Sequence, residues 1–352
     1  MDLAVTSQDV LTKKEGLAGR LRLNRPKALH SLTTAMCLAI SSALLAWRED
    51  PAVDLVLVDH AGERGFCAGG DIRMLAESGA GDGVAARAFF MAEYRMNALL
   101  FDYPKPVVTV MDGVTMGGGV GLAMPSKFRI ATERTTFAMP ETGIGLFPDV
   151  GGGWYLPRLE RHAGMWLAVT GARIKAADCF ELKIATHVVA AADVPALKAA
   201  VIAEPTELPA AIGRFADEPT SAPVRAHLDD IDRLFGQPGA EAIVAALEAD
   251  GSDWGKEQLA TMRTKSPQTI KIAYRQLVSG AQLTSFADNM VMEYRIAARV
   301  VRSPDFIEGV RAVIVDKDNA PRWNPPTLAG VTEASLDAIF APLPPGEEWT
   351  PV

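Results

Sequence analysis

The sequence predicts an α/β fold in which short strands alternate with helices and form a largely parallel sheet. A continuous β-branched run at 53–59, VDLVLVD, has the length and composition of a strand buried on both faces. The segment before it, 31–47, carries apolar residues at helical spacing. Glycine-rich loops at 62–70 and 113–121 each follow an apolar run. Strands that alternate with helices imply crossover connections, which pair strands in parallel.

The first helix is expected over 31–47, with Ser31 or Thr33 as its N-cap, because a hydroxyl there can accept a first-turn N–H. Its apolar positions fall on one face: Leu32, Ala35, Met36, Ala39, Ile40, Ala43, Leu44 and Trp47. A second buried strand is expected at 107–111, and shorter strands at 128–131 and 136–138.

The loop at 113–121 contains Gly117, Gly118 and Gly119, and a helix is expected to begin near Gly119 or Val120. The first turn of a helix leaves N–H groups without internal partners, and glycine lets a ligand oxygen approach them closely. The loop therefore indicates an anion or oxyanion site. A tight turn with close helix–strand packing explains the same glycines, and the loop alone leaves both interpretations open.

The loop at 62–70 ends in Ala68, Gly69 and Gly70, and Asp71 is a plausible cap for the helix after it. Two loops of this kind can each give one N–H to a single oxygen. Motifs for other phosphate and acyl chemistries are absent from the sequence: the dinucleotide fingerprint, a Gly-Lys-Ser/Thr loop and a Gly-x-Ser-x-Gly elbow.

Two acids, Glu141 and Asp149, stand in the run FAMPETGIGLFPDVGGG at 137–153, which has no other charge. Its aromatic and aliphatic residues lower the local dielectric, which raises a carboxyl pKa and makes the carboxylate a better base. Two such acids fit general acid–base or nucleophilic chemistry. Helix capping by both acids is the structural alternative, and composition does not decide between them.

Composition limits the class of protein. The chain has 352 residues, 49% hydrophobic, with a net charge of −8, which argues against nucleic acid and anionic membrane surfaces as partners. The odd number of scattered cysteines, Cys37, Cys67 and Cys179, predicts free thiols. No Cys/His pairs have the spacing of zinc ligands, so we expect no structural metal. No apolar run approaches the length of a membrane span. The N-terminal MDLAVTSQDV does not resemble a targeting segment, so we expect a cytoplasmic protein.

Three parts are expected along the chain: a core at 1–189, a helical insertion at 190–253 rich in Ala, Pro, Glu and Asp, and a C-terminal helical region at 254–352. Within the last part, 286–301 has the spacing of one long amphipathic helix.

Four motifs together resemble the enoyl-CoA hydratase/isomerase (crotonase) superfamily over most of 16–189: LNRPKALHSL, GFCAGGDI, MDGVTMGGGVGLAM and FAMPETGIGLFPDVGGGWYLPRL. The last of these and the run DFIEGVRAVIVDKDNAPRWNP at 305–325 are most similar to the branch of 3-hydroxyisobutyryl-CoA hydrolases. The resemblance implies a crotonase-like fold of repeated ββα units with a C-terminal helical region. It also implies thioester hydrolysis of an acyl-CoA in valine breakdown, with no cofactor beyond the CoA of the substrate, and a possible homo-oligomer.

The resemblance also assigns roles by position. The oxyanion donors fall on Gly70 and Gly118, the catalytic glutamate on Glu141 and its acidic partner on Asp149. Substrate contacts fall on Glu93, Lys27, Ala28, Leu29, Ala68 and Asp71. Whether Glu141 attacks the carbonyl carbon or activates a water stays open.

One departure from the superfamily pattern bears on the reaction. A hydratase of this superfamily uses two glutamates, and the first falls on Gly121, which has no side chain. The resemblance therefore favours thioester hydrolysis over hydration. An enoyl-CoA hydratase or isomerase is the alternative enzyme, and a non-catalytic acyl-CoA-binding protein is the alternative of another class.

Overall fold

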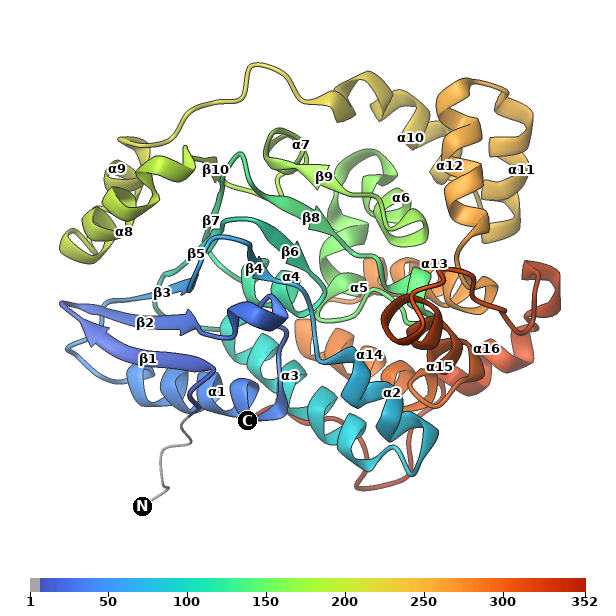
Figure 1. Cartoon of the computed structure of the whole chain (residues 1–352), viewed down its shortest axis with the longest axis horizontal. Helices are drawn as coiled ribbons and strands as arrows, with labels where there is room; N and C mark the ends of the chain where they lie inside the picture. Colours follow the sequence, from blue (N-terminus) through green and yellow to red (C-terminus); the bar gives the residue numbers. More distant parts are fainter. Residues whose placement is uncertain (1–6) are drawn as a thin grey trace.

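Two β-sheets organise residues 7–352, the part of the chain that the computed structural model describes (Figure 1). The larger sheet has the order β1-β2-β3-β5-β7-β10, and the smaller has the order β4-β6-β8-β9. Among the strand pairs of the described residues, only β1–β2 and β8–β9 are antiparallel, so the prediction of a largely parallel sheet is confirmed. The strands of the larger sheet are Val10–Glu15, Ala18–Leu23, Leu55–His60, Val107–Met111, Phe128–Ala131 and His187–Val188, and those of the smaller are Gly65–Cys67, Val114–Met116, Thr136–Ala138 and Ile174–Lys175.

Successive chain segments repeat one pattern, in which a strand of the larger sheet is followed by a strand of the smaller sheet and then by a helix. The three repeats are β3–β4 with α2 (Ile72–Ala80), β5–β6 with α4 (Gly118–Ala123), and β7–β8 with α5 (Gly152–Tyr155). Because β4, β6 and β8 are parallel neighbours, the loops that follow them emerge at one edge of the smaller sheet. These loops carry the glycines and the acids singled out in the sequence.

The first helix, α1, spans Thr34–Arg48, and Thr33 rather than Ser31 caps it by accepting the Met36 N–H at 3.3 Å. Strands β5, β7 and β8 have the predicted bounds, β3 lies slightly later than predicted, and α4 begins at Gly118, one residue early. The long C-terminal helix is α14, Phe286–Val300.

The larger sheet has an apolar core on each face, because successive side chains of its buried strands point to opposite faces. Val56 and Val58 belong to the main core, over which α1, α3 (Val84–Phe101) and α14 pack. Leu55 and Leu57 belong to a second core covered by α8 (Val194–Ala203) and α9 (Leu208–Gly213), which lie apart from the other helices in Figure 1. The three cysteines are buried and free, as predicted.

The segment predicted as a helical insertion, 190–253, packs in two places. Its first half forms α8 and α9 on the larger sheet, whereas its second half packs against α6 and α12. The three-part division of the chain stays a prediction. The remaining helices are α6 Ala163–Thr170, α7 Ala176–Glu181, α10 Leu228–Phe235, α11 Ala240–Asp250, α12 Asp253–Arg263, α13 Pro267–Gln282, α15 Pro304–Val310 and α16 Glu333–Phe340.

No helix within residues 7–352 is both long and apolar enough to span a bilayer. The prediction that no targeting signal is present rests on the N-terminal segment MDLAVTSQDV. The first six residues of this segment lie outside the described part of the chain.

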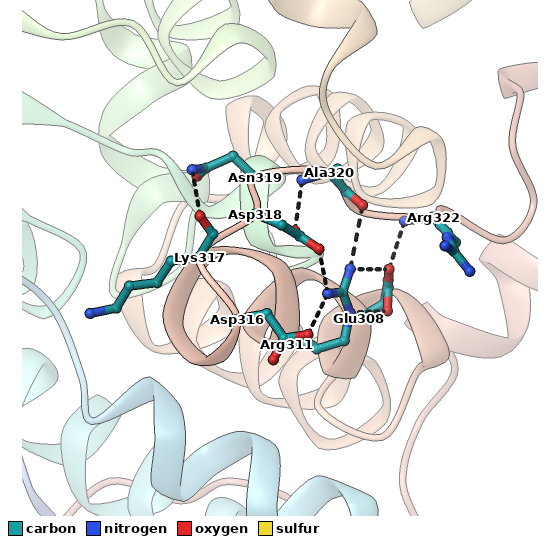
Figure 2. A network of polar contacts seen from close by, with 8 residues as sticks. All are labelled: Glu308, Arg311, Asp316, Lys317, Asp318, Asn319, Ala320 and Arg322. Atoms are coloured by element: carbon teal, nitrogen blue, oxygen red, sulfur yellow. Dashed lines mark hydrogen bonds and ion pairs between the residues drawn. The ribbon is translucent and has the colours of Figure 1, made fainter.

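An arginine-centred network shapes the turn after α15 (Figure 2). The Arg311 guanidinium donates to Glu308 at 2.9 Å and to Asp316 and Asp318 at 2.7 Å. The Asp318 carboxylate also accepts the Ala320 N–H at 2.9 Å. Three carboxylates on one cation fix the path of the chain from the end of α15 toward Asn324.

That path ends beside the acid-bearing loop. The Asn324 N–H donates to the buried carboxylate of Asp305 at 2.7 Å, and the Ser266 hydroxyl donates to the same carboxylate at 2.5 Å. The Ser266 N–H in turn donates to the Thr142 carbonyl at 3.0 Å. The C-terminal region therefore braces the residue next to Glu141.

Candidate active site

A small cavity of ≈ 60 Å³ lies where the loops after β4, β6 and β8 meet. Six of the predicted site residues line it, and the rest of its wall is mainly apolar. The lining residues are Ala68, Gly69, Gly70, Ile72, Leu75, Phe89, Phe90, Glu93, Met116, Gly117, Gly118, Pro140, Glu141, Ile144, Leu146 and Asp149.

Two glycine N–H groups at this cavity have no acceptor among the described residues. Gly118 opens α4, so its N–H has no carbonyl one turn earlier within the helix. Gly70 forms a parallel β-bridge with Leu32, in which the Leu32 N–H donates to the Gly69 carbonyl and the Asp71 N–H donates to the Leu32 carbonyl. This bridge does not use the Gly70 N–H. The two loops touch, since a Cβ added to Gly69 would lie 3.9 Å from the Gly118 nitrogen. This arrangement can bind an oxygen that carries negative charge.

The Glu141 side chain faces the same loops. It is only 5% exposed, and one of its carboxylate oxygens, Oε2, has no hydrogen-bond partner among the described residues. The other oxygen points toward Gly117, since a Cβ added there would lie 3.2 Å from Glu141 Oε1. Burial raises the pKa of Glu141 well above its ordinary value, and the nearby Asp149 charge adds to the effect. An unpartnered, desolvated carboxylate of this kind can act as a nucleophile or as a base.

The Asp149 carboxyl group is 4% exposed and is held by the Tyr94 hydroxyl of α3, which donates to Oδ2 at 2.9 Å. Burial raises the pKa of Asp149 to about 7, and the Tyr94 hydrogen bond acts in the opposite direction. Asp149 does not cap α5, whose N-cap is Gly151, so the capping interpretation of this acid is wrong.

The Glu93 carboxyl group lies opposite Gly118 on the buried side of α3. It is 2% exposed, and its Oε1 has no partner within residues 7–352. A Cβ added to Gly118 would lie only 2.6 Å from that oxygen, so any side chain at 118 would displace Glu93. Burial raises the pKa of Glu93 well above its ordinary value, with a smaller contribution from the charges of Asp149 and Glu141.

The remaining predicted contacts lie beside the cavity and not in its wall. Lys27 and Ala28 belong to the 3-10 turn Pro26–Ala28, and Leu29 follows it. This turn adjoins the first glycine loop, because the Ala68 N–H donates to the Leu29 carbonyl at 3.0 Å. Asp71 caps α2 and accepts a hydrogen bond from Arg25 at 3.1 Å, so its visible role is structural.

Three site residues were missed in the sequence: Tyr94, Asn97 and Glu293. All are polar side chains on the buried face of an apolar helix, and Glu293 stood visibly on the apolar face predicted for 286–301. The signal that could have identified them is a polar residue among the apolar positions of a predicted helix, because a polar group buried there needs a partner or a function.

No ion pair neutralises the four buried acids Glu93, Glu141, Asp149 and Glu293 within the described residues. Because burial raises their pKa values, the folded protein binds protons more tightly than the unfolded chain above about pH 4, up to about pH 7 at Asp149 and about pH 8 at Glu293. Their contribution to stability is therefore largest at low pH and is lost as the pH rises through the folded pKa values.

The variant D149N is expected to unfold at a higher temperature than the wild type at pH 8, by about 2 °C or more, because it removes one buried charge. At pH 5, where Asp149 is already protonated in the folded protein, the two melting temperatures should converge. Calorimetry at both pH values measures this. An equal difference at both would contradict the assigned charge state.

Comparison with known proteins gives consistent similarities along nearly the whole chain. A family profile described as enoyl-CoA hydratase/isomerase matches residues 18–340. A zebrafish (Danio rerio) protein named 3-hydroxyisobutyryl-CoA hydrolase, mitochondrial, is 43% identical over 347 residues, which cover 95% of this chain and 90% of the zebrafish protein. The human (Homo sapiens) protein of the same name is 40% identical over 346 residues, which cover 96% and 89%.

Two solved structures superpose closely on this chain. A carnitinyl-CoA dehydratase from Mycobacterium thermoresistibile gives a TM-score of 0.93 at 40% identity and covers 98% of this chain and 99% of its own. An enoyl-CoA hydratase from Rhodobacter sphaeroides gives 0.91 at 39% identity and covers 97% and 100%. These superpositions confirm the fold class predicted from the sequence.

Proposed function

The chain belongs to the enoyl-CoA hydratase/isomerase family, and from this premise we propose that it is a thioesterase that hydrolyses 3-hydroxyisobutyryl-CoA to 3-hydroxyisobutyrate and CoA. The observation that carries the proposal is the meeting of two unpartnered glycine N–H groups and an unpartnered buried glutamate in one cavity. Curated relatives with about 40% identity over nearly the whole chain are named as hydrolases of this ester.

In the proposed reaction, the thioester carbonyl oxygen lies between the N–H groups of Gly70 and Gly118. As the carbonyl carbon is attacked, negative charge moves onto this oxygen and the two donors stabilise it, which is often the largest single catalytic contribution. Glu141 either attacks the carbon to give an anhydride, which water then opens, or removes a proton from the attacking water. In both routes the C–S bond breaks, CoA leaves as a thiolate that takes up a proton, and one water is consumed. The oxygen that the acyl group gains comes from that water or, where water opens the anhydride at the glutamyl carbon, from Glu141, which takes the water oxygen in exchange.

The other acids suit the acyl group. Asp149, held by Tyr94, orients the attacking water or the substrate hydroxyl. Glu93 lines the cavity and has a buried Oε1 without a partner among the described residues, which fits a hydroxyl-bearing acyl chain. The cavity is small, ≈ 60 Å³, and is walled by Phe89, Phe90 and Leu146, which favours a short acyl group. These features favour a four-carbon hydroxyacyl ester in valine breakdown.

Gly121 distinguishes hydrolysis from hydration. A Cβ added to Gly121 would lie 2.7 Å from both Asn97 Nδ2 and Val150 Cβ, so the position where the superfamily resemblance puts a hydratase glutamate has no room for a side chain. The names of the similar solved structures include a dehydratase and a hydratase, but the geometry at Gly121 favours the hydrolase.

Assays with two esters test the proposal. The protein is offered 3-hydroxyisobutyryl-CoA and crotonyl-CoA, and free thiol and enoyl absorbance are followed together. Thiol release from the hydroxy ester supports the thioesterase. Loss of enoyl absorbance without thiol would identify a hydratase, and no change with either ester would indicate a binding protein. A chelator should leave thiol release unchanged, since the proposed chemistry uses no metal or added cofactor.

The variant G121E is expected not to hydrate crotonyl-CoA and to lose thiol release by about 100-fold or more, because the new side chain would push Asn97 and Val150 out of place next to Asp149. Both rates are measured on protein whose circular dichroism matches the wild type. Gain of hydration in G121E would show that the site accepts the second glutamate.

We also propose that the protein acts on an acyl-CoA without nucleic acid or membrane partners, that it is cytoplasmic, and that it forms a homo-oligomer. The curated relatives described above are named as mitochondrial proteins, so cell fractionation is the test of location. Light scattering of the purified chain measures its oligomeric state.

A further inference from the structure

A buried glutamate outside the cavity, Glu293 of α14, binds the turn that follows Asp149. The Glu293 side chain is 0% exposed. Its Oε2 accepts the Gly151 N–H at 2.8 Å, and its Oε1 accepts the Gly153 N–H at 2.9 Å. The amides of Asn289 and Gln276 also donate to Oε1, at 2.9 and 3.1 Å. Four donors thus converge on one carboxylate that has no cation beside it among residues 7–352.

The turn held by Glu293 has a strained backbone. Val150, directly after Asp149, has a φ of +52°, and Gly151 has a φ of +95°. The left-handed region is unfavourable for a β-branched residue such as valine, and such conformations persist only where the surroundings enforce them. Strain of this kind next to a reactive group points to a requirement on the direction of that group.

The other side of Asp149 is held by the same network. Gln276 of α13 donates to the Pro148 carbonyl at 2.7 Å, so one amide group contacts both Glu293 and the residue before Asp149. Asp149 is therefore flanked on both sides by backbone that side chains of α13 and α14 fix. This backbone places the Asp149 carboxylate where the Tyr94 hydroxyl donates to it at 2.9 Å.

We propose that Glu293 is a positioning residue, which enforces the strained turn at Val150 and thereby aims Asp149 at the reacting centre. This inference rests on the proposed function, since it takes Asp149 to assist thioester hydrolysis. The ionised form of Glu293 fits this network, because both of its oxygens accept: in a glutamine, the NH2 group would face the Gly151 or Gly153 N–H, donor against donor. Burial raises the pKa of Glu293 to about 8, and the Gly151 and Gly153 N–H groups act in the opposite direction by stabilising the carboxylate. The positioning role is therefore tested above pH 8, where Glu293 is ionised.

A double-mutant cycle tests whether Glu293 acts through Asp149. The variants E293Q, D149N and E293Q/D149N are assayed for kcat and KM with 3-hydroxyisobutyryl-CoA, and their melting temperatures are recorded. In the wild-type background, E293Q should lower kcat about 10- to 100-fold and change KM less than about threefold. In the D149N background the same change should lower kcat less than about twofold, because residues that act as a unit are not additive.

The matched control is D178N. Asp178 is also buried and its carboxylate also accepts two backbone N–H groups, from Val224 at 2.9 Å and Lys175 at 3.4 Å, but it does not line the cavity. D178N should lower the melting temperature and leave kcat unchanged. Equal kcat losses from E293Q with and without Asp149, or a kcat loss in D178N as large as in E293Q, would overturn the positioning role.

A second variant covers the case in which E293Q does not fold. Q276L keeps side-chain volume but leaves the Pro148 carbonyl and Glu293 each without one donor. It should lower kcat about five- to tenfold, and this loss should also vanish in the D149N background. Full kcat in folded Q276L together with an unfolded E293Q would also overturn the inference. Absence of thiol release from the wild type would instead refute the proposed function itself.

Discussion

Replacement of Glu141 by glutamine is expected to lower kcat for thiol release by about 10³-fold or more while the CoA ester still binds. Glutamine has the same shape, but its amide can neither attack a carbonyl carbon nor accept a proton from water. The cavity wall and the two glycine donors should be unchanged, since Glu141 Oε2 has no partner in the described structure whose loss would unfold the loop. Turnover is measured by thiol release, and binding by calorimetric titration of the inactive variant with the ester.

The control for E141Q is E160Q, since Glu160 is an exposed residue that pairs with Lys183 and does not line the cavity. E160Q should keep full turnover. Retention of more than a tenth of wild-type turnover in E141Q would remove Glu141 from the chemistry. A single turnover of the wild type in H₂¹⁸O adds mechanistic detail, because heavy oxygen in the Glu141 carboxyl group would demonstrate direct attack.

The second large effect is expected at Asp149. D149N should lower kcat by about 10²- to 10³-fold, because a neutral amide cannot orient or activate the attacking water as the carboxylate does. The Tyr94 hydroxyl can still donate to the asparagine oxygen, so the local structure should remain. The variant Y94F should cost less, about tenfold, since it removes only the hydrogen bond that orients Asp149.

The pH dependence of these variants completes the test. The wild-type kcat/KM should rise through about pH 7 from the acid side, because Asp149 with a pKa of about 7 must be ionised, and Glu141 with a raised pKa must be ionised too. In D149N the rise should follow Glu141 alone and change position. A profile of D149N identical to that of the wild type would show that Asp149 does not titrate in the working site.

The local pattern of the sequence predicted some elements well and missed others for physical reasons. Strand β5 is apolar apart from Thr109 and β7 is apolar apart from Arg129, and both are largely buried in the sheet, so their bounds followed from composition. Strands β4 and β6 have only three residues each and adjoin glycines, so periodicity could not identify them. They appeared in the sequence only as parts of glycine-rich loops.

The candidate site shows the same division. Gly70, Gly118, Glu93, Glu141 and Asp149 line one cavity, as the motif resemblance implied, although their catalytic roles stay predictions. The hydrogen bonds of Glu293 to Gly151 and Gly153 could not be predicted, because they join residues that are separated by 142 and 140 positions in the sequence. Such a contact depends on how α14 packs against the turn, which no local pattern specifies.

During synthesis, the residues that support the site leave the ribosome long after the acids whose backbone they fix. The acids at 141 and 149 emerge early, but Ser266, Gln276 and Glu293, which fix their backbone, emerge more than a hundred residues later. Domains of nascent chains fold as units when enough of them has emerged. A ribosome-bound fragment that ends before α13 should therefore be catalytically silent, and competence should arise only when synthesis is nearly finished.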